Sequence, residues 1–213
     1  MKEGSRDAWQ RLYAKHGLQY GGRGDIRAIE PFVKPGMIAL DAGCGDGKTT
    51  ELLAKKCEVV GCDFSREALS ALRSQRQPPD SLNLVECDLR SLPFEREKFD
   101  AISCVHALSH MMADERFAVA RELMRVLKPH GHILIEVFGV QDIRFGEGEQ
   151  IEHDSFMRGT GIMTHYFREH EVGELFPELR LVSEVNQIRR ISLGTVAGKR
   201  ETIRVLLEGT TGS

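Results

Sequence analysis

The chain has 213 residues, a length that suits one α/β domain with a sizeable core. Its net charge of −3 and its pI of about 6.3 argue against a protein that grips long nucleic acid by charge alone, although they leave room for a local basic patch. Because no stretch reaches the roughly 20 apolar residues of a membrane span, and because the first residues lack the apolar core of a secretory signal, we expect a cytoplasmic protein with no membrane partner.

The N-terminal region, residues 1–36, is predicted to form a helical extension. Residues 5–17 have the pattern of one helix and residues 25–33 that of a second. A glycine-rich break between them contains Arg23. The extension is therefore a candidate lid, with Trp9 on its first helix.

The core, residues 37–138, alternates short apolar runs with amphipathic segments. Strands are predicted near residues 37–42, 57–63, 82–87, 99–104 and 132–138. Helices are predicted near residues 47–56, 65–76 and 113–127. This alternation is typical of a parallel sheet with helices on both of its faces.

The C-terminal part has a different pattern. Residues 139–176 are rich in Gly, Glu and His with weak periodicity, and we expect them to cover the site and to end in a short helix. Within residues 177–208, the runs Arg180–Leu193 and Glu201–Leu207 predict two strands. The loop between them, Gly194–Arg200, is short enough to favour an antiparallel hairpin.

Together these elements predict one α/β domain over residues 1–213. Its sheet is expected to be doubly wound and seven-stranded, mostly parallel, with helices on both faces and an antiparallel strand in the C-terminal hairpin. Within it we expect a helical extension or lid (1–36), a ligand-binding core (37–138), a cover segment (139–176) and a strand hairpin (177–208).

A glycine-rich turn between the first two predicted strands is the most informative motif. The first strand ends in Asp41, and the turn runs from there to Gly47. The second strand ends in Asp63, about 20 residues after Gly43, the first glycine of the turn. A strand, a glycine-rich loop, a helix and a strand ending in an acid form a crevice for a nucleoside, whose ribose hydroxyls the acid can bind.

Three kinds of loop fit this position, and they differ in their ligand. The dinucleotide fingerprint requires a third glycine where this chain has Lys48. A phosphate loop is matched in part by Gly47-Lys48-Thr49, but Asp41 and Asp46 flank it and would repel phosphate. A loop for a ligand without phosphates fits best, because its glycines let the backbone approach an amino acid and a ribose.

Five segments resemble the motifs of class I S-adenosylmethionine-dependent methyltransferases, in the order and spacing of that family. They are Asp41–Gly47, Val59–Ser65, Val85–Leu89, Phe99–Cys104 and Leu127–His132. The resemblance implies S-adenosylmethionine as the cofactor, with S-adenosylhomocysteine as its product, and requires no metal.

The resemblance also implies which residues bind the cofactor. Gly43 and Gly45 would allow close approach of the backbone, Asp63 would hold the ribose, and Phe64 would lie near the adenine. The full set of expected cofactor-binding residues is Arg23, Asp41, Gly43, Cys44, Gly45, Asp63, Phe64, Asp88, Leu89 and Val105.

Candidate catalytic residues lie after the fourth strand and in the cover segment. His106 and His110 are four residues apart, so one helical face could present both where the reacting methyl group is expected. Tyr166-Phe167 resembles the entry to the last helix in tellurite-resistance-type and related small-molecule methyltransferases. A purely structural role for His110 stays open.

Several functions remain in competition. The short chain and its mild acidity favour methyl transfer to a small molecule. A tRNA- or protein-directed methyltransferase is the alternative, because several arginines could gather near the site. These are Arg23, Arg158, Arg189, Arg190 and Arg204. A phosphate-loop nucleotide hydrolase and a cofactor-binding regulator without catalysis are weaker alternatives.

Overall fold

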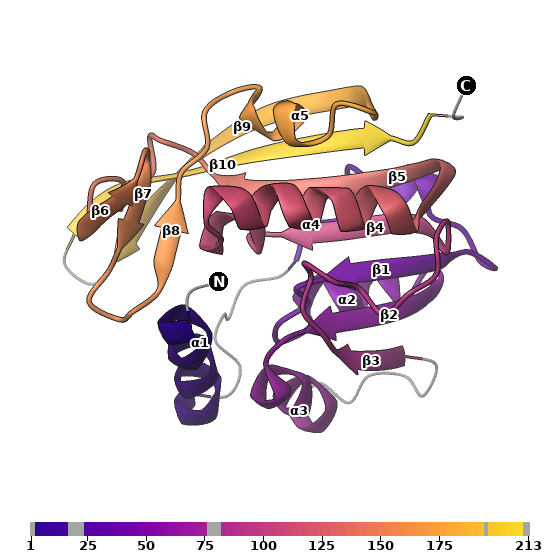
Figure 1. The fold of residues 1–213 in the computed structure, drawn as a ribbon, viewed down its shortest axis with the longest axis horizontal. Coiled ribbons are helices and arrows are strands. Elements are labelled where there is room, and N and C mark those ends of the chain that lie inside the picture. The colour runs from indigo at the N-terminus through magenta and orange to yellow at the C-terminus, as the bar shows by residue number, and fades with distance from the viewer. Residues whose placement is uncertain (1–2, 17–23, 76–81, 194–195, 211–213) are drawn as a thin grey trace.

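A single seven-stranded sheet organises the chain (Figure 1). The computed structural model describes residues 3–16, 24–75, 82–193 and 196–210. The strand order is β3-β2-β1-β4-β5-β10-β9. The strands are β1 (Ile38–Ala42), β2 (Glu58–Asp63), β3 (Leu82–Glu86), β4 (Phe99–Val105), β5 (Leu127–Phe138), β9 (Arg180–Leu193) and β10 (Val196–Glu208). β1 to β5 pair in parallel, whereas β10 is antiparallel to both β5 and β9, which confirms the predicted sheet.

Helices cover both faces of this sheet, as the sequence predicted. They are α1 (Glu3–His16), α2 (Lys48–Leu53), α3 (Arg66–Gln75), α4 (Ala113–Val126) and α5 (Glu171–Leu175), with the short 3-10 helices η1 (Glu30–Phe32) and η2 (Leu108–His110). One apolar cluster packs α4 and α5 on the sheet, and a second packs α2 and α3 on it. Since alternate residues of a strand point to opposite faces, Leu40 joins the first cluster and its neighbour Ala39 joins the second.

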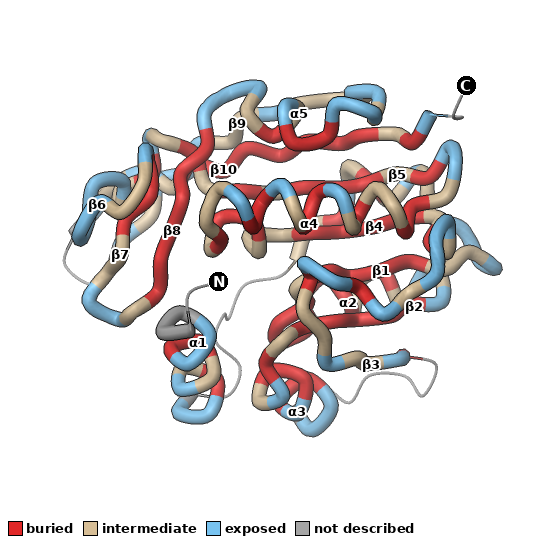
Figure 2. Tube along the Cα trace, in the orientation of Figure 1, coloured by how far each residue is buried: buried red, intermediate tan, exposed pale blue. Residues whose placement is uncertain are grey.

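The central strands are the most deeply buried part of the molecule (Figure 2). Ile102 of β4, Ile133 of β5 and Val205 of β10 are fully buried. Strands buried on both faces have continuous apolar runs, which is why the sequence located this part of the sheet.

The helix expected over residues 25–33 is wrong. The structure has turns there, followed by the three residues of η1. Pro31 has no N–H to donate, and a proline disfavours the helical conformation of the residue before it. The apolar positions Ile29 and Val33 are nevertheless buried, so this segment covers the sheet without forming a regular helix.

The loop expected over residues 194–200 is also wrong, because β10 begins at Val196 and pairs with Leu193. Gly198 lies inside the strand, where a glycine usually weakens a sheet. A Cβ on Gly198 would come within 2.2 Å of the side chain of Ile143. The glycine therefore allows the cover segment to pack directly on the hairpin.

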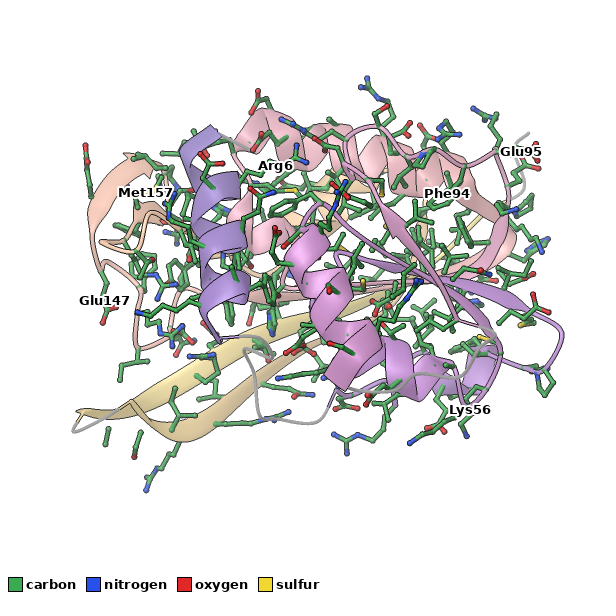
Figure 3. The ribbon with its side chains drawn as sticks, turned by 90° about the horizontal axis from the view of Figure 1, so that it is seen from below. Arg6, Lys56, Phe94, Glu95, Glu147 and Met157 are labelled. Atoms are coloured by element: carbon green, nitrogen blue, oxygen red, sulfur yellow. The ribbon has the colours of Figure 1, made fainter. Side chains whose placement is uncertain are left out.

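A second, antiparallel sheet forms within the cover segment, and the sequence did not predict it. Its strands are β6 (Glu149–Glu152), β7 (Ser155–Met157) and β8 (Met163–His165). α1 packs against this sheet's β7–β8 connection through Ile162 and against α3 through Ala68. Figure 3 accordingly shows α1 standing between α3 and the segment that carries Met157.

Candidate active site

A cavity of about 1150 Å³ opens at the carboxyl ends of β1, β2, β4 and β5. In an α/β sheet of this kind, ligands bind at that edge, where the strand order reverses. Its lining comes from the glycine-rich turn, from α1, from the segment after β4, and from the cover segment and the hairpin. The cavity thus has one end at the turn and another between the cover segment and β9–β10.

The glycine-rich turn forms the floor of the first end. Gly43 and Gly45 have φ angles of 73° and 49°, a region that glycine enters at little cost. A Cβ on Gly43 would lie 2.7 Å from that of Ala107, and one on Gly45 would lie 2.6 Å from the Tyr13 hydroxyl oxygen. The turn therefore leaves room for a ligand to approach its backbone closely.

Asp63 lies beside this floor with a buried carboxylate. Its Oδ2 accepts a hydrogen bond from the Gly45 N–H, and its Oδ1 accepts one from the Ser65 N–H, each at 2.9 Å. Burial raises the pKa of Asp63 to about 6, although these backbone hydrogen bonds oppose the shift. Each oxygen keeps a further lone pair, so the carboxylate suits a ribose diol.

Apolar and charged groups continue the wall of the cavity at this end. Phe64 and the buried Leu89 line the cavity, and the Arg6 guanidinium lies 5.5 Å from the centroid of the Phe64 ring. Asp88 also lines the cavity, and its Oδ2 accepts a hydrogen bond of 2.6 Å from Arg90. That hydrogen bond lowers the pKa of Asp88, so the carboxylate is charged and some of its acceptor capacity is already taken by Arg90.

Asp41 and Cys44 also line the cavity. The Asp41 carboxylate accepts hydrogen bonds from the hydroxyls of Thr50, at 2.6 Å, and Ser103, at 2.7 Å. It therefore ties α2 and β4 to β1. Burial raises the pKa of the Cys44 thiol well above its usual value, so this thiol is not a nucleophile.

His106 follows β4 directly and is held in a left-handed conformation, with φ of 63°. Its backbone N–H donates a hydrogen bond of 2.7 Å to the Glu136 carbonyl, and its ring stacks on Phe138 at a centroid distance of 4.2 Å. Its Nδ1 is buried and has no hydrogen-bond partner among the described residues. Burial, helped by the charge of Arg200, lowers the pKa of His106 to about 3, so the ring is neutral.

His110 lies on η2, one turn further along. Its Nδ1 is 2.7 Å from the Met163 carbonyl oxygen, and because that oxygen can only accept, Nδ1 carries the proton. The lone pair is therefore on Nε2. Burial lowers the pKa of His110 to about 4, and Trp9 of α1 packs edge-on against the ring at 4.9 Å.

Tyr166 is fully buried in the wall of the second end, among Phe138, Phe145 and Phe156. Burial raises its pKa to about 12, so the phenol stays protonated at neutral pH. Tyr166 can bound the cavity or donate a hydrogen bond, but it is not a base.

The structure brings nearly all of the expected site residues to this cavity. The expected residues that line it are Asp41, Gly43, Cys44, Gly45, Asp63, Phe64, Asp88, Leu89, Val105, His106, His110 and Tyr166. Arg23 lies outside the described residues. Among the described residues, no group of three or more His, Cys, Asp or Glu side chains could hold a metal ion.

Sequence reasoning missed a buried charged network at the second end. Arg204 of β10 donates to Glu136 Oε2 at 2.9 Å and to Asp25 Oδ2 at 2.9 Å. The Glu136 Oε1 lies 3.6 Å from His106 Nε2. A signal was present, because Glu136 interrupts the apolar run 133–138 and Arg204 interrupts the apolar run 203–207.

The family model named "Methyltransferase domain" matches residues 40–135 of the chain. The tRNA N(3)-methylcytidine methyltransferase Mettl2 of Drosophila melanogaster is 31% identical over 157 residues, which cover 68% of this chain and 48% of that protein. The human probable tRNA methyltransferase 9B is 31% identical over 109 residues, which cover 51% of this chain and 23% of that protein. The chain thus spans about half the length, or less, of these relatives.

Solved structures share the fold. A structure described as a SAM-dependent methyltransferase from Methanosarcina mazei has a TM-score of 0.74 at 23% identity, covering 87% of this chain and 98% of that one. A Burkholderia thailandensis 1,6-didemethyltoxoflavin-N1-methyltransferase with bound S-adenosylhomocysteine has a TM-score of 0.61 at 20% identity, covering 99% of this chain and 80% of that one.

Residues 40–135 thus match a methyltransferase domain model, and the seven-stranded sheet has the fold of solved structures described as SAM-dependent methyltransferases. The expected tellurite-resistance-type branch is not among these similarities and stays a prediction. No helix among the described residues is long and apolar enough to cross a membrane.

Proposed function

We propose that this protein transfers a methyl group in line from S-adenosylmethionine to a small acceptor held at the second end of the cavity. One observation carries the proposal: a single cavity of about 1150 Å³ joins the Asp63 end to the His110 end. This volume exceeds the roughly 300–1,000 Å³ of a site for one drug-sized ligand. It has room for a cofactor and a small second molecule side by side.

The residues at the first end fit the cofactor. The turn at Gly43 and Gly45 gives a backbone floor, Asp63 offers two acceptor oxygens for a ribose, and Phe64 and Leu89 give an apolar slot for a base. When bound, the cofactor supplies an activated methyl group on a sulfonium. The chain then needs to align the acceptor and exclude water, and alignment alone can contribute roughly 7–11 kcal/mol.

His110 is the proposed proton acceptor. As the acceptor atom forms its bond to the methyl carbon, the carbon–sulfur bond breaks and its electron pair returns to sulfur. An acceptor that carries a proton then passes it to Nε2 of His110, which holds a lone pair because Nδ1 donates to Met163. Trp9 packs against His110 and the buried Tyr166 lines the same cavity, so we expect both to limit the access of water.

The first test is calorimetric titration of the protein with S-adenosylhomocysteine, with ATP-magnesium as the control. We expect micromolar binding of the first ligand and none of the second. A screen of small acceptors, read as S-adenosylhomocysteine formed, then tests transfer. Binding of ATP-magnesium alone would overturn the proposal in favour of a phosphate-loop enzyme, for which Lys48 would be essential.

A tRNA acceptor is the second candidate, favoured by the names of the relatives and by arginines that line the cavity. The match covers only 48% and 23% of those relatives, so their activity does not carry over directly. Methyl incorporation into unmodified tRNA, measured in parallel with the small-acceptor screen, distinguishes the two candidates.

A further inference from the structure

Arginines from three separate segments converge on the second end of the cavity. Arg144 follows β5, Arg158 follows β7, and Arg189 lies on the edge strand β9; all three line the cavity. They are far apart in the sequence, so their meeting is a property of the fold. No local sequence motif predicts that these three arginines lie at one site.

The other arginines at this end are already neutralised. Arg204 is bound by Glu136 and Asp25, and Arg200 is 2.6 Å from Asp142. By contrast, Arg144, Arg158 and Arg189 form no ion pair with any described residue, and the buried Arg158 Nε has no hydrogen-bond partner among them. A buried guanidinium nitrogen without a partner carries a desolvation cost that a bound anion would remove.

The pairing of the hairpin adds to this excess of positive charge. Arg189 lies directly opposite Arg200 across β9 and β10, and Arg190 lies directly opposite Lys199. Like charges in directly opposite positions destabilise a sheet. Because side chains alternate between faces, the first pair is at the cavity and the second is on the other face.

The same positive charge reaches the groups that would contact the acceptor. Burial is the largest cause of both pKa shifts, lowering the pKa of His110 and raising that of Tyr166. The charges of Arg144 and Arg158 act to lower both pKa values. An anion held by these arginines would therefore lie close to the proposed proton acceptor and the aromatic wall.

We propose that Arg144, Arg158 and Arg189 bind an anionic group of the methyl acceptor, a phosphate or a carboxylate. The inference rests on the proposed function, because it assigns the substrate class of the same site. The anionic group orients the acceptor, while its nucleophilic atom faces His110. The shared chemistry fits a small anionic aromatic molecule and a nucleotide of tRNA alike.

The test uses protein saturated with S-adenosylhomocysteine, so that the cofactor's own carboxylate is already in place. Phenyl phosphate and benzoate are the anionic probes, and benzamide is the neutral probe; binding is measured by calorimetry. We expect the anionic probes to bind at least about tenfold more tightly than benzamide, because charge-assisted hydrogen bonds to arginine are strong. Equal binding of benzoate and benzamide would overturn the inference.

Variants locate the effect. Arg158→Gln and Arg189→Gln should each weaken phenyl phosphate by about tenfold, while Arg121→Gln, an exposed position on α4, should leave it unchanged. The affinity for S-adenosylhomocysteine should stay within twofold throughout. If Arg158→Gln weakens S-adenosylhomocysteine but not 5′-methylthioadenosine, the arginine binds the cofactor carboxylate and the inference fails.

Arg190 and Lys199, the pair on the outer face of the hairpin, are used to distinguish a small acceptor from tRNA as the source of the anion. A double variant, Arg190→Gln with Lys199→Gln, should leave phenyl phosphate binding unchanged. If the acceptor is tRNA, the same double variant should weaken tRNA binding and reduce the salt dependence of that binding. A wild-type protein that does not bind S-adenosylhomocysteine would contradict the proposed function itself, which separates that failure from a failure of the arginine site.

Discussion

Asp63 combines two features from which we expect cofactor binding to depend on pH. Its oxygens face the cavity as acceptors, and burial raises its pKa to about 6. A protonated carboxyl accepts fewer hydrogen bonds, so we expect the affinity for S-adenosylhomocysteine to fall as pH drops below about 6, by up to about tenfold per pH unit. Calorimetry between pH 8 and 5 measures this, and His106 and His110 do not interfere because their pKa values are about 3 and 4.

The control for this prediction is Asp63→Asn. The amide places a donor against the N–H of Gly45 or Ser65 and should weaken binding by about tenfold or more at pH 8, with little further change at low pH. A wild-type affinity that is constant from pH 8 to 5 would show that Asp63 does not bind the ribose in its charged form.

His110 can be tested apart from cofactor binding. His110→Gln keeps a donor for the Met163 carbonyl but has no basic nitrogen, so we expect kcat to fall by about 10²–10⁴-fold for an acceptor that carries a proton. The affinity for S-adenosylhomocysteine should be unchanged. His130→Gln, at an exposed position of β5, is the matched control, and a kcat of His110→Gln equal to that of the wild type would assign His110 a structural role.

At the scale of the elements, α1 closes the site through a few contacts. Trp9 packs on the His110 ring at 4.9 Å, and Ala8 and Tyr13 join a small cluster with α3 and Ile162. This cluster is separate from the two large cores of the sheet. We therefore expect α1 to detach without unfolding of the rest of the chain.

We accordingly predict that Trp9→Ala loosens α1 while leaving the sheet intact. Hydrogen exchange over residues 3–16 should speed up, and kcat/KM should fall by about tenfold or more because water enters the site. The melting temperature should change little. Lys15→Ala, on the exposed side of α1, serves as the control, and a large fall in melting temperature for Trp9→Ala would show that α1 belongs to the main core.

The elements that sequence alone located are those with local causes. Strands such as β1 and β4 are continuous apolar runs. The turn at Gly43 needs a backbone conformation that only a few residue types adopt readily. The small sheet β6–β8 was missed because its short strands have no clear alternation and are held by pairing across turns. The helix over residues 25–33 was wrong because Pro31 outweighed the apolar spacing.

The same distinction holds for the site of the whole molecule. Its proposed cofactor end comes from one stretch of local spacing, so Asp63 and Leu89 could be named from the sequence. Its proposed acceptor end is assembled from residues such as Arg144 and Arg200, which approach only after the hairpin and the cover segment have packed. Pairings of this kind have no local signature, so they require the structure.

Two partly buried, neutral histidines also couple the site to the stability of the whole molecule. His106 and His110 have pKa values of about 3 and 4 in the folded chain, against about 6.5 when unfolded. Between these limits the unfolded chain binds more protons, so their contribution to stability is complete above pH 6.5 and is lost as pH falls toward 4. The raised pKa of Asp63 has the opposite effect on how stability depends on pH. The acid sensitivity of the wild type must therefore be compared with that of a variant that keeps Asp63.

We therefore predict that the double variant His106→Gln with His110→Gln loses less stability on acidification than the wild type. Between pH 7 and 5 the difference in the free energy of unfolding should shift by about 1–3 kcal/mol in favour of the variant, after a discount for partial exposure of the His106 ring. Urea denaturation at both pH values measures it, with the m-value as the check on two-state behaviour. Because Asp63 and the other carboxylates are the same in both proteins, their titration cancels, and equal acid sensitivity would mean that the histidines are not held neutral by burial.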